Sequence, residues 1–496
     1  MAAGVQRTPT GISGFDEVAM GGLPASRSTL VTGTTGSGKT LFALEFLARG
    51  IMKFGDRGVF VTFDEAPEDL RTNAVSLGFD IAEWERDGKW AFVDVSVREE
   101  ETLTVGDYDL GGLMSRVEHA VGQVGAKRVS VDSLATLLMR FQDREMVRRE
   151  LSRLTRMLES LGVTSVLTTE RDHEYDHLTR HGVEEFVLDN VLIIRNVLQN
   201  ERRRRTLEVV KFRGTTHRTG EWLFTIDPAE GLVIIPLAFL TPRERASQER
   251  VSTGVPDLDE MVDGGVYRDA LVLVTGPSGS GKTLMALKFA DAAFQAGERS
   301  LFYAFDETRD QLHRNAAGWG MDLEAMESSG LLRITTAYPE EASVEDHFLS
   351  IRKNIADFAP TRLIIDSLSA LERRGATRTL LDFVIALGAL ARKHEITTLF
   401  TASPSDARIL DSRAPAVEIA SVTDVMVLLR YAEYAGTVQR VIAVLHSRGS
   451  AHDPTVRRVD IDQTGMRVGD RYTAGFRPFP DMAVTPPEQR PHRPGD

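Results

Sequence analysis

The run Ser28-Thr29-Leu30-Val31 leads into the glycine-rich stretch Gly33-Thr34-Thr35-Gly36-Ser37-Gly38-Lys39-Thr40, and this succession decides the fold. An apolar, strand-like run comes first, then the loop, then a helix-like segment from Leu41 to Gly50. In that setting the glycines let backbone N–H groups surround phosphates, the lysine reaches the β- and γ-phosphates, and the threonine hydroxyl ligates Mg²⁺. The stretch therefore predicts a P-loop that binds a nucleotide.

A second copy of the same succession lies further along the chain. Leu271-Val272-Leu273-Val274 precedes the second loop and a helix-like segment from Leu284 to Ala296 follows it. The loop itself reads Gly276-Pro277-Ser278-Gly279-Ser280-Gly281-Lys282-Thr283. Two copies in matched surroundings predict two nucleotide sites.

Other landmarks repeat in the same order, which predicts two homologous domains rather than two coincidental loops. The repeated pairs are Gly11–Glu17 with Gly254–Glu260, Phe60–Glu65 with Phe302–Glu307, Asn73-Ala74 with Asn315-Ala316, Val129–Ser133 with Leu363–Ser367, and Arg213-Gly214 with Arg448-Gly449. We expect a first domain over residues 1–240, a polar linker over 241–250 and a second domain over 251–470. The proline-rich residues 471–496 are expected to be disordered.

Within each copy, helix-like segments alternate with short β-branched runs such as Val59–Phe63, Ala91–Val95, Arg128–Val131 and Ser165–Thr168. That alternation predicts an α/β fold with a mostly parallel central sheet. Later runs, Val191–Arg195 and Leu207–Phe212, predict a hairpin around the cluster Arg202-Arg203-Arg204-Arg205. The cluster is interpreted as a charged turn or a subunit contact without chemistry.

Composition narrows the class of protein. A chain of 496 residues is too long for one core. The absence of cysteine excludes disulfides and thiol catalysis and suits the cytoplasm. The longest apolar runs are too short to span a membrane, and the N-terminus lacks the apolar core of a secretory signal. The net charge of −13 argues against broad binding of nucleic acid.

Carboxylates follow several of the apolar runs. Asp132 and Asp366 each end such a run, where a carboxylate can hold Mg²⁺ opposite Thr40 or Thr283; a plain strand-end aspartate is the alternative. Asp64-Glu65 and Asp306-Glu307 end the strands one βαβ step after the P-loops, so we expect them in the same crevice. We predict that Glu65 and Glu307 are the catalytic bases, assisted by Asp64 and Asp306, against the alternative of solvated loop charge.

Cations also recur far from the P-loops. Lys211-Phe212-Arg213-Gly214-Thr215-Thr216-His217 closes the late strand of the first copy. Such cations can reach the γ-phosphate of a neighbouring subunit, as arginine fingers do; a solvated basic edge or a nucleic-acid contact is the alternative. The second copy has Arg448-Gly449-Ser450, with His446 in place of the lysine.

Taken together, these residues resemble the KaiC family of tandem RecA-like ATPases and autokinases. The resemblance runs from about Thr8 to about Asp462 and rests also on Gly182–Val187, Glu201–Glu208, Trp319–Asp322, Ala337–Glu340 and Ile365–Leu371. It implies two tandem RecA-like domains, a homohexamer with ATP and Mg²⁺ between subunits, hydrolysis mainly in the first domain and autophosphorylation in the second. Beyond the two P-loops, it implies ATP contacts from Ser76, Lys211, Phe212, Arg213, Thr215, His217, Trp319, Arg440, Arg448, Gly449 and Ser450. For Trp319, core packing is an equal alternative to stacking on adenine.

The family's acceptor stretch corresponds to Glu418-Ile419-Ala420-Ser421-Val422-Thr423-Asp424. Ala420 replaces the first of two adjacent acceptors, Ser421 stands at the second, and Thr423 matches a nearby threonine that serves as a transient acceptor. We predict phosphorylation of Ser421 and Thr423, against the alternative that Ser421 is an ordinary serine on a strand.

The family implies protein partners as well. A KaiB-like protein is expected on the first domain, where the acidic segment Ser96–Leu110 is either its docking loop or a solvated loop. The proline-rich tail does not match the family's helical KaiA-binding tail, which argues against control by KaiA. Leu381 and His446 replace basic residues of the family's second domain.

The leading hypothesis is thus an ATPase and serine/threonine autokinase for timing or signalling. A RecA- or DnaB-like motor on DNA and an ATP-gated scaffold without kinase activity are the alternatives. The acidic balance gives the motor little support.

Overall fold

The structure is a computed structural model that describes residues 5–95, 110–138, 144–175, 187–199, 202–235, 246–372, 377–403, 415–434 and 436–472. The chain divides into two compact units, Met1–Phe239 and Leu240–Asp496. The expected KaiB-facing segment, apart from Leu110, and the tail beyond Tyr472 lie outside the described residues.

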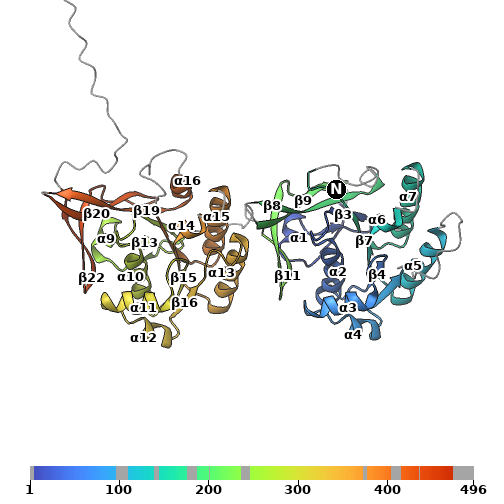
Figure 1. Ribbon diagram of the computed structural model, residues 1–496, viewed down its shortest axis with the longest axis horizontal. Helices are drawn as coiled ribbons and strands as arrows, with labels where there is room; N and C mark the ends of the chain where they lie inside the picture. The colour runs from blue at the N-terminus through green and yellow to red at the C-terminus, as the bar shows by residue number, and fades with distance from the viewer. Residues whose placement is uncertain are drawn as a thin grey trace, which may run out of the picture. The chain divides into compact units, whose positions relative to one another are not determined.

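A single large sheet organises the first unit (Figure 1). Within the described residues its strand order is β11-β10-β9-β8-β3-β7-β6-β4-β5. All neighbours from β8 to β5 are parallel, whereas β8 to β11 are antiparallel. The strands are β1 (Arg7–Thr8), β2 (Leu23–Pro24), β3 (Ser28–Gly33), β4 (Gly58–Thr62), β5 (Trp90–Asp94), β6 (Arg128–Asp132), β7 (Thr164–Glu170), β8 (Asn190–Gln199), β9 (Arg202–Phe212), β10 (Glu221–Asp227) and β11 (Gly231–Ile234).

Helices connect the parallel strands, as a parallel pairing requires. They are α1 (Phe15–Val18), α2 (Lys39–Arg49) continued by the π-helical turn η1 (Gly50–Phe54), α3 (Pro67–Val75), α4 (Ile81–Arg86), α5 (Leu110–Val124), α6 (Leu134–Leu138) and α7 (Arg144–Ser160). Every residue of β3, β4 and β6 is buried, because helices cover both faces of a parallel sheet. The P-loop strand β3 therefore lies in the middle of the core.

The second unit repeats this plan. Its sheet order is β16-β15-β17-β18-β14-β19-β20-β21-β22, parallel up to β19 and antiparallel beyond it. The strands are β12 (Arg250–Val251), β13 (Val266–Tyr267), β14 (Leu271–Thr275), β15 (Ser300–Ala304), β16 (Leu332–Thr336), β17 (Arg362–Asp366), β18 (Thr397–Ala402), β19 (Val425–Tyr434), β20 (Thr437–Ser447), β21 (Arg457–Asp462) and β22 (Gly465–Arg471). The helices are α9 (Pro256–Met261), α10 (Lys282–Gln295), α11 (Arg309–Gly318), α12 (Leu323–Ser328), α13 (Val344–Phe358), α14 (Leu368–Glu372), α15 (Thr377–Lys393) and α16 (Pro415–Val422).

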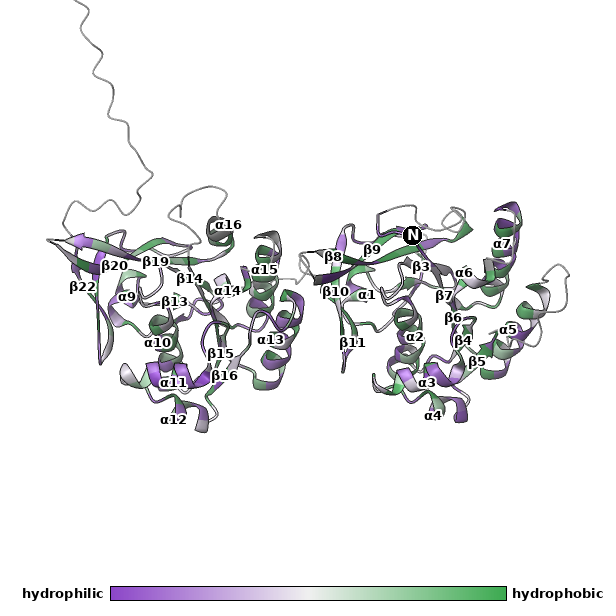
Figure 2. Ribbon diagram, in the orientation of Figure 1, coloured by the Kyte–Doolittle hydropathy of each residue, from purple (hydrophilic) through white to green (hydrophobic). Residues whose placement is uncertain are grey.

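Hydropathy follows burial in each unit. Figure 2 shows mainly hydrophobic residues on the central strands and largely hydrophilic ones on α11. The helices that follow the P-loops, α2 and α10, each bury eight residues, including the P-loop lysine at the start. Burial on this scale fixes each P-loop rigidly against the sheet.

The α/β fold with mostly parallel sheets, predicted from the alternation of helices and strands, is confirmed, as is the β8–β9 hairpin. Two local predictions are wrong. The cluster Arg202–Arg205 is part of strand β9, paired with Gln199–Asn196, and is not a turn. Ser421 lies in the last turn of helix α16 and not on a strand. None of the helices in the described ranges is both long and apolar enough to cross a membrane.

Candidate nucleotide sites

The first P-loop folds as a tight cradle because its glycines adopt conformations that other residues avoid. Gly36 and Gly38 have φ values of 73° and 105°. A Cβ atom on Gly33 would come within 2.2 Å of the carbonyl oxygen of Ile194 on β8. The backbone can therefore pass this close to the neighbouring strand only with glycine at that position.

The second P-loop has the same geometry. Gly279 and Gly281 have φ values of 75° and 107°. A Cβ atom on Gly276 would lie 2.5 Å from the carbonyl oxygen of Leu429. Within the described residues, the buried hydroxyls of Ser37 and Ser280 have no hydrogen-bond partner. Both loops thus keep the shape and the polar lining of a phosphate site.

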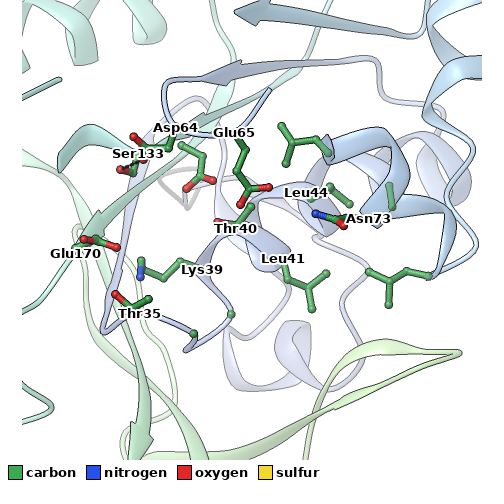
Figure 3. Close-up of a pocket in the computed structure, with 16 residues that line it drawn as sticks. Thr35, Lys39, Thr40, Leu41, Leu44, Asp64, Glu65, Asn73, Ser133 and Glu170 are labelled. Carbon is green, nitrogen blue, oxygen red and sulfur yellow. Dashed lines mark hydrogen bonds between the residues drawn. The ribbon is translucent and has the colours of Figure 1, made fainter. Parts of the chain in front are cut away.

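A pocket of about 460 Å³ opens beside the first P-loop (Figure 3). Its polar wall includes Lys39, Thr40, the pair Asp64-Glu65, Asp132 and Glu170. Its apolar wall consists of Leu41, Leu44, Leu70, Ala74 and Leu77. A polar end next to an apolar end suits the phosphates and the base of a nucleotide.

The P-loop lysines are buried at the polar end. Lys39 Nζ donates to the carbonyl of Thr34 at 2.9 Å, and Lys282 Nζ donates to those of Gly276 and Pro277 at 2.8 and 3.0 Å. Burial lowers the pKa of Lys39, an effect that Glu170, Asp132 and Glu174 oppose. Burial likewise lowers the pKa of Lys282, opposed by Asp366 and Asp306. Each lysine is a cation with little water around it, and phosphate oxygens can replace its carbonyl partners.

The strand-end aspartates are held beside the P-loop threonines. Thr168 donates a hydrogen bond to Asp132, and Thr401 donates one to Asp366. Burial raises the pKa of both carboxyls, while hydrogen bonds from Thr40 to Asp132 and from Thr283 to Asp366 oppose the rise. One hydroxyl and one carboxylate in contact are the two protein groups expected to hold Mg²⁺ on ATP. No group of three or more acidic, histidine or cysteine side chains forms a metal site in the described part of the chain, so the nucleotide phosphates would complete the coordination.

The two members of each acidic pair have different surroundings. Ser133 Oγ donates to Asp64 at 2.8 Å, and Ser367 Oγ donates to Asp306 at 2.5 Å. The glutamates instead have raised pKa values, chiefly because of burial and next because of the nearby aspartate, Asp132 for Glu65 and Asp366 for Glu307. A carboxylate with a raised pKa is the better proton acceptor, which supports the glutamates as bases.

The predicted cations of the first unit, Lys211 and Arg213, lie at one end of the strands, and the P-loop of the same unit lies at the other end, which we call the P-loop edge; the cations are at the far edge. Phe212 on β9 pairs with Asn190, which pairs with Thr29 at the start of β3, whereas the P-loop follows the end of β3. Arg213 forms an ion pair with Asp189 at 3.2 Å and its carbonyl accepts from Arg27 at 2.5 Å.

Other predicted ATP contacts of the first unit gather at that same far edge. Thr215 Oγ1 accepts a hydrogen bond from Arg7 at 2.5 Å. The rings of His217 and Phe212 lie 5.5 Å apart. Lys211 pairs with Val191 one step along β8. Ser76, by contrast, lies at the end of α3, where its hydroxyl donates to the carbonyl of Asn73 at 2.7 Å.

In the second unit the predicted residues divide between the two edges. Arg440 Nε donates to the carbonyl of Gly279 at 3.1 Å, and Tyr431 Oη donates to that of Ser278 at 3.2 Å, so both hold their own P-loop. Trp319 ends α11 and packs, half-buried, against the core, in the place that Leu77 has in the first pocket.

Arg448, Gly449 and Ser450 follow β20 at the far edge. Arg448 Nη2 donates to the carbonyl of Ser421. The Gly449 carbonyl accepts from Tyr267 at 3.3 Å, and Ser450 Oγ accepts from Arg250 at 2.7 Å. The structure thus brings Arg448 to the predicted acceptor and separates both from the P-loop of the same chain.

The two predicted acceptors differ in access. Ser421 is exposed. Thr423 has 0% exposure, and its hydroxyl donates to the carbonyl of Ala420 at 3.2 Å. Of the two predicted acceptors, only Ser421 is exposed in this conformation.

Sequence reasoning missed Glu170 and gave no role to Asn73. Glu170 ends β7, next to Gly33 in the parallel register, and Figure 3 shows its carboxylate directed toward Lys39. The sequence did offer one signal for Glu170, namely that this carboxylate comes directly after a strand-like run. The second copy has no such carboxylate, because Ser403 follows Ala402, the strand partner of Thr275. Asn73 lines the pocket with Glu65, which the repeated Asn-Ala pair did not reveal.

Both units match known proteins in sequence. The family described as "ATPase: KaiC" matches residues 8–238 and 251–472. The "Circadian clock protein KaiC3" of Synechocystis sp. is 45% identical over 471 residues, covering 94% of this chain and 92% of the relative. The "Circadian clock oscillator protein KaiC" of Thermosynechococcus vestitus is 45% identical over 471 residues, covering 95% and 90%. That of Prochlorococcus marinus strain MIT 9313 is 44% identical over 479 residues, covering 96% and 95%.

Proposed function

Because the chain belongs to the KaiC family of ATPases, we propose that it is both an ATPase and a serine/threonine autokinase that works as a homohexamer. ATP hydrolysis takes place mainly in the first domain, and phosphorylation of Ser421 takes place in the second. The names of its relatives refer to circadian clocks, which supports a role in timing or signalling.

The observation that carries this proposal is the position of Ser421 relative to the second P-loop. Asp424, three residues after Ser421, exchanges two hydrogen bonds of 2.8 Å with Leu271 at the start of β14. The P-loop begins at the other end of that strand, and a strand of five residues spans roughly 13 Å. Figure 1 accordingly shows α16 and α11 on opposite sides of the second unit. A phosphoryl group can then reach Ser421 only from ATP on another copy, which supports ATP sites between subunits.

In the first domain the residues fit hydrolysis. Lys39 binds the β- and γ-phosphates, while Thr40 and Asp132 would hold Mg²⁺, whose charge would offset that of the phosphates. Glu65 orients a water molecule and accepts its proton. Lys211 and Arg213, at the far edge, stabilise the transferred group on a neighbouring copy.

In the second domain the same parts serve transfer to a hydroxyl. The Ser421 oxygen forms a bond to the γ-phosphorus, the bond to the β-phosphate oxygen breaks, ADP leaves, and the hydroxyl proton passes to Glu307. Lys282 binds the phosphates, and Thr283 with Asp366 would hold Mg²⁺. The first domain has Glu185-Phe186 at the place of the acceptor, so its sequence offers no hydroxyl there.

Partners follow from the family. We propose that the first domain binds a KaiB-like protein and that no KaiA-type control acts through the tail. An ATP-gated scaffold would need an inactive second site, but Lys282, Asp366 and Glu307 are all in place there.

The test combines labelled ATP with mixed chains. Wild-type protein with Mg²⁺ and γ-labelled ATP should become labelled, and Ser421→Ala should lose the label. A Lys282→Ala chain binds no ATP at its second site but keeps Ser421, so it should be labelled only when mixed with Ser421→Ala chains.

Absence of label in wild type would favour the scaffold, and unchanged label in Ser421→Ala would refute the acceptor. Label in wild type but none in the mixture would refute transfer between copies.

A further inference from the structure

The two proposed catalytic glutamates are held differently. Asn315, on α11, donates a hydrogen bond from Nδ2 to Glu307 Oε2 at 3.0 Å. Asn73 occupies the same place on α3 and lines the first pocket together with Glu65 (Figure 3). No hydrogen bond joins Asn73 to Glu65, although both side chains belong to the described part of the first unit.

The bond holds Glu307 on the side of α11. The acidic groups that act on the phosphate-binding Lys282 are Asp366 and Asp306. Glu307 itself has two partners on α11, the amide of Asn315 and the charge of Arg314, and it is repelled by Asp366 and Asp306. Both influences draw its carboxylate toward the helix and away from the other two carboxylates.

Taking the proposed role of Glu307 as the base, we propose that Asn315 is a positioning residue that holds Glu307 against α11 and thereby slows attack by water on ATP at the second site. The bond occupies one carboxylate oxygen and stabilises the ionised form of Glu307, so Glu307 is a weaker base for water while the bond lasts. Hydrogen bonds to charged groups are among the stronger ones, so we expect this bond to lower the rate of hydrolysis roughly tenfold.

Transfer to serine is slowed less. The hydroxyl of Ser421 from a neighbouring copy can donate to Glu307 in place of Asn315, and the protein has already fixed its position. A water molecule must be immobilised to do the same. Asn315 therefore favours autophosphorylation over futile hydrolysis at this site.

The experiment isolates the second site by placing each variant in a Glu65→Gln chain, whose first site binds ATP but does not turn it over. Asn315→Leu removes the donor and keeps a side chain that branches at Cγ. We expect phosphate release to rise roughly tenfold at unchanged ATP affinity. His313→Leu is the matched control, because it removes a 2.7 Å contact of the same helix with Glu327 without touching Glu307, and release should stay unchanged.

A double substitution shows whether Asn315 acts through Glu307. In a Glu307→Gln chain, Asn315→Leu should add no further release, because the base is gone. Unchanged or slower release in Asn315→Leu would overturn the inference, as would an equal gain in the double variant. If Glu307→Gln alone does not slow release, the base assignment in the proposed function fails instead, and the two failures are thus distinguished.

Discussion

Arg448 donates a hydrogen bond through Nη2 to the backbone carbonyl of Ser421, so a cation at the end of β20 holds the last turn of α16. A guanidinium at a helix C-terminus satisfies a carbonyl that the helix leaves unpaired and interacts favourably with its dipole. The conformation of the acceptor thus depends on a strand residue of the same chain.

We therefore expect Arg448→Ala to lower phosphate incorporation at Ser421 severalfold. The ratio of label to bound ATP is the measurement, because a loss of nucleotide binding alone would leave that ratio unchanged. Arg440→Ala is the contrasting variant, since Arg440 contacts the P-loop carbonyl of Gly279 and its loss should act on ATP affinity.

Thr423→Ala should leave the label almost unchanged and destabilise the second domain. The side chain is fully buried and its hydroxyl donates to Ala420, so its removal costs about 1 kcal/mol or more of unfolding free energy. Denaturant unfolding and label incorporation, measured on the same preparation, check both parts. A large loss of label at full stability would instead make Thr423 the acceptor.

Asp366→Asn should stabilise the second domain without nucleotide and abolish the stabilisation of that domain by Mg²⁺ and ATP. Burial raises the pKa of Asp366, so the folded state holds its proton more tightly than the unfolded state. Stability then falls as pH rises through this raised pKa, and the ionised carboxylate is a cost above it. Asparagine removes that cost and can still accept from Thr401.

Thermal unfolding of wild type and Asp366→Asn, each with and without Mg²⁺ and ATP, is the measurement. A lower melting temperature of the variant without nucleotide would contradict the prediction.

Glu170→Gln should strengthen ATP binding at the first site roughly three- to tenfold. The carboxylate of Glu170 faces Lys39, so it attracts the lysine that must bind phosphate and repels the phosphate itself. Titration of a Lys282→Ala chain with a fluorescent ATP analogue measures the first site alone. The converse change, Ser403→Glu, should weaken the second site, and weaker binding in Glu170→Gln would refute this role.

The sequence predicted the fold class and the strand, loop and helix at both glycine-rich stretches correctly, because each depends on local order. Strand, glycine-rich loop and helix follow one another within about 25 residues, and the same order occurs twice. It failed where a segment's conformation depends on distant partners. Ser421 lies in a helix held by Arg448, and Arg202–Arg205 extend a strand because they pair with β8.

Glu170 shows a second kind of limit. Comparing the two copies revealed what they share and concealed what only one of them has. The structure brings Glu170 to Lys39 because β7 lies beside β3, a neighbourhood formed by residues more than a hundred positions apart.

The sequence by itself thus determined two phosphate cradles, the acidic pairs that follow their strands and the parallel sheets that carry both. Only the tertiary structure decided which side chains lie together at the same end of the sheet's strands. The carboxyl ends of the parallel strands lie together at one end of the sheet, so Lys282, Asp366 and Glu307 gather there. Ser421 precedes the parallel strand β19 and Arg448 follows the antiparallel strand β20, so both residues lie at the other end. That separation depends on pairing across the sheet, which local sequence does not encode.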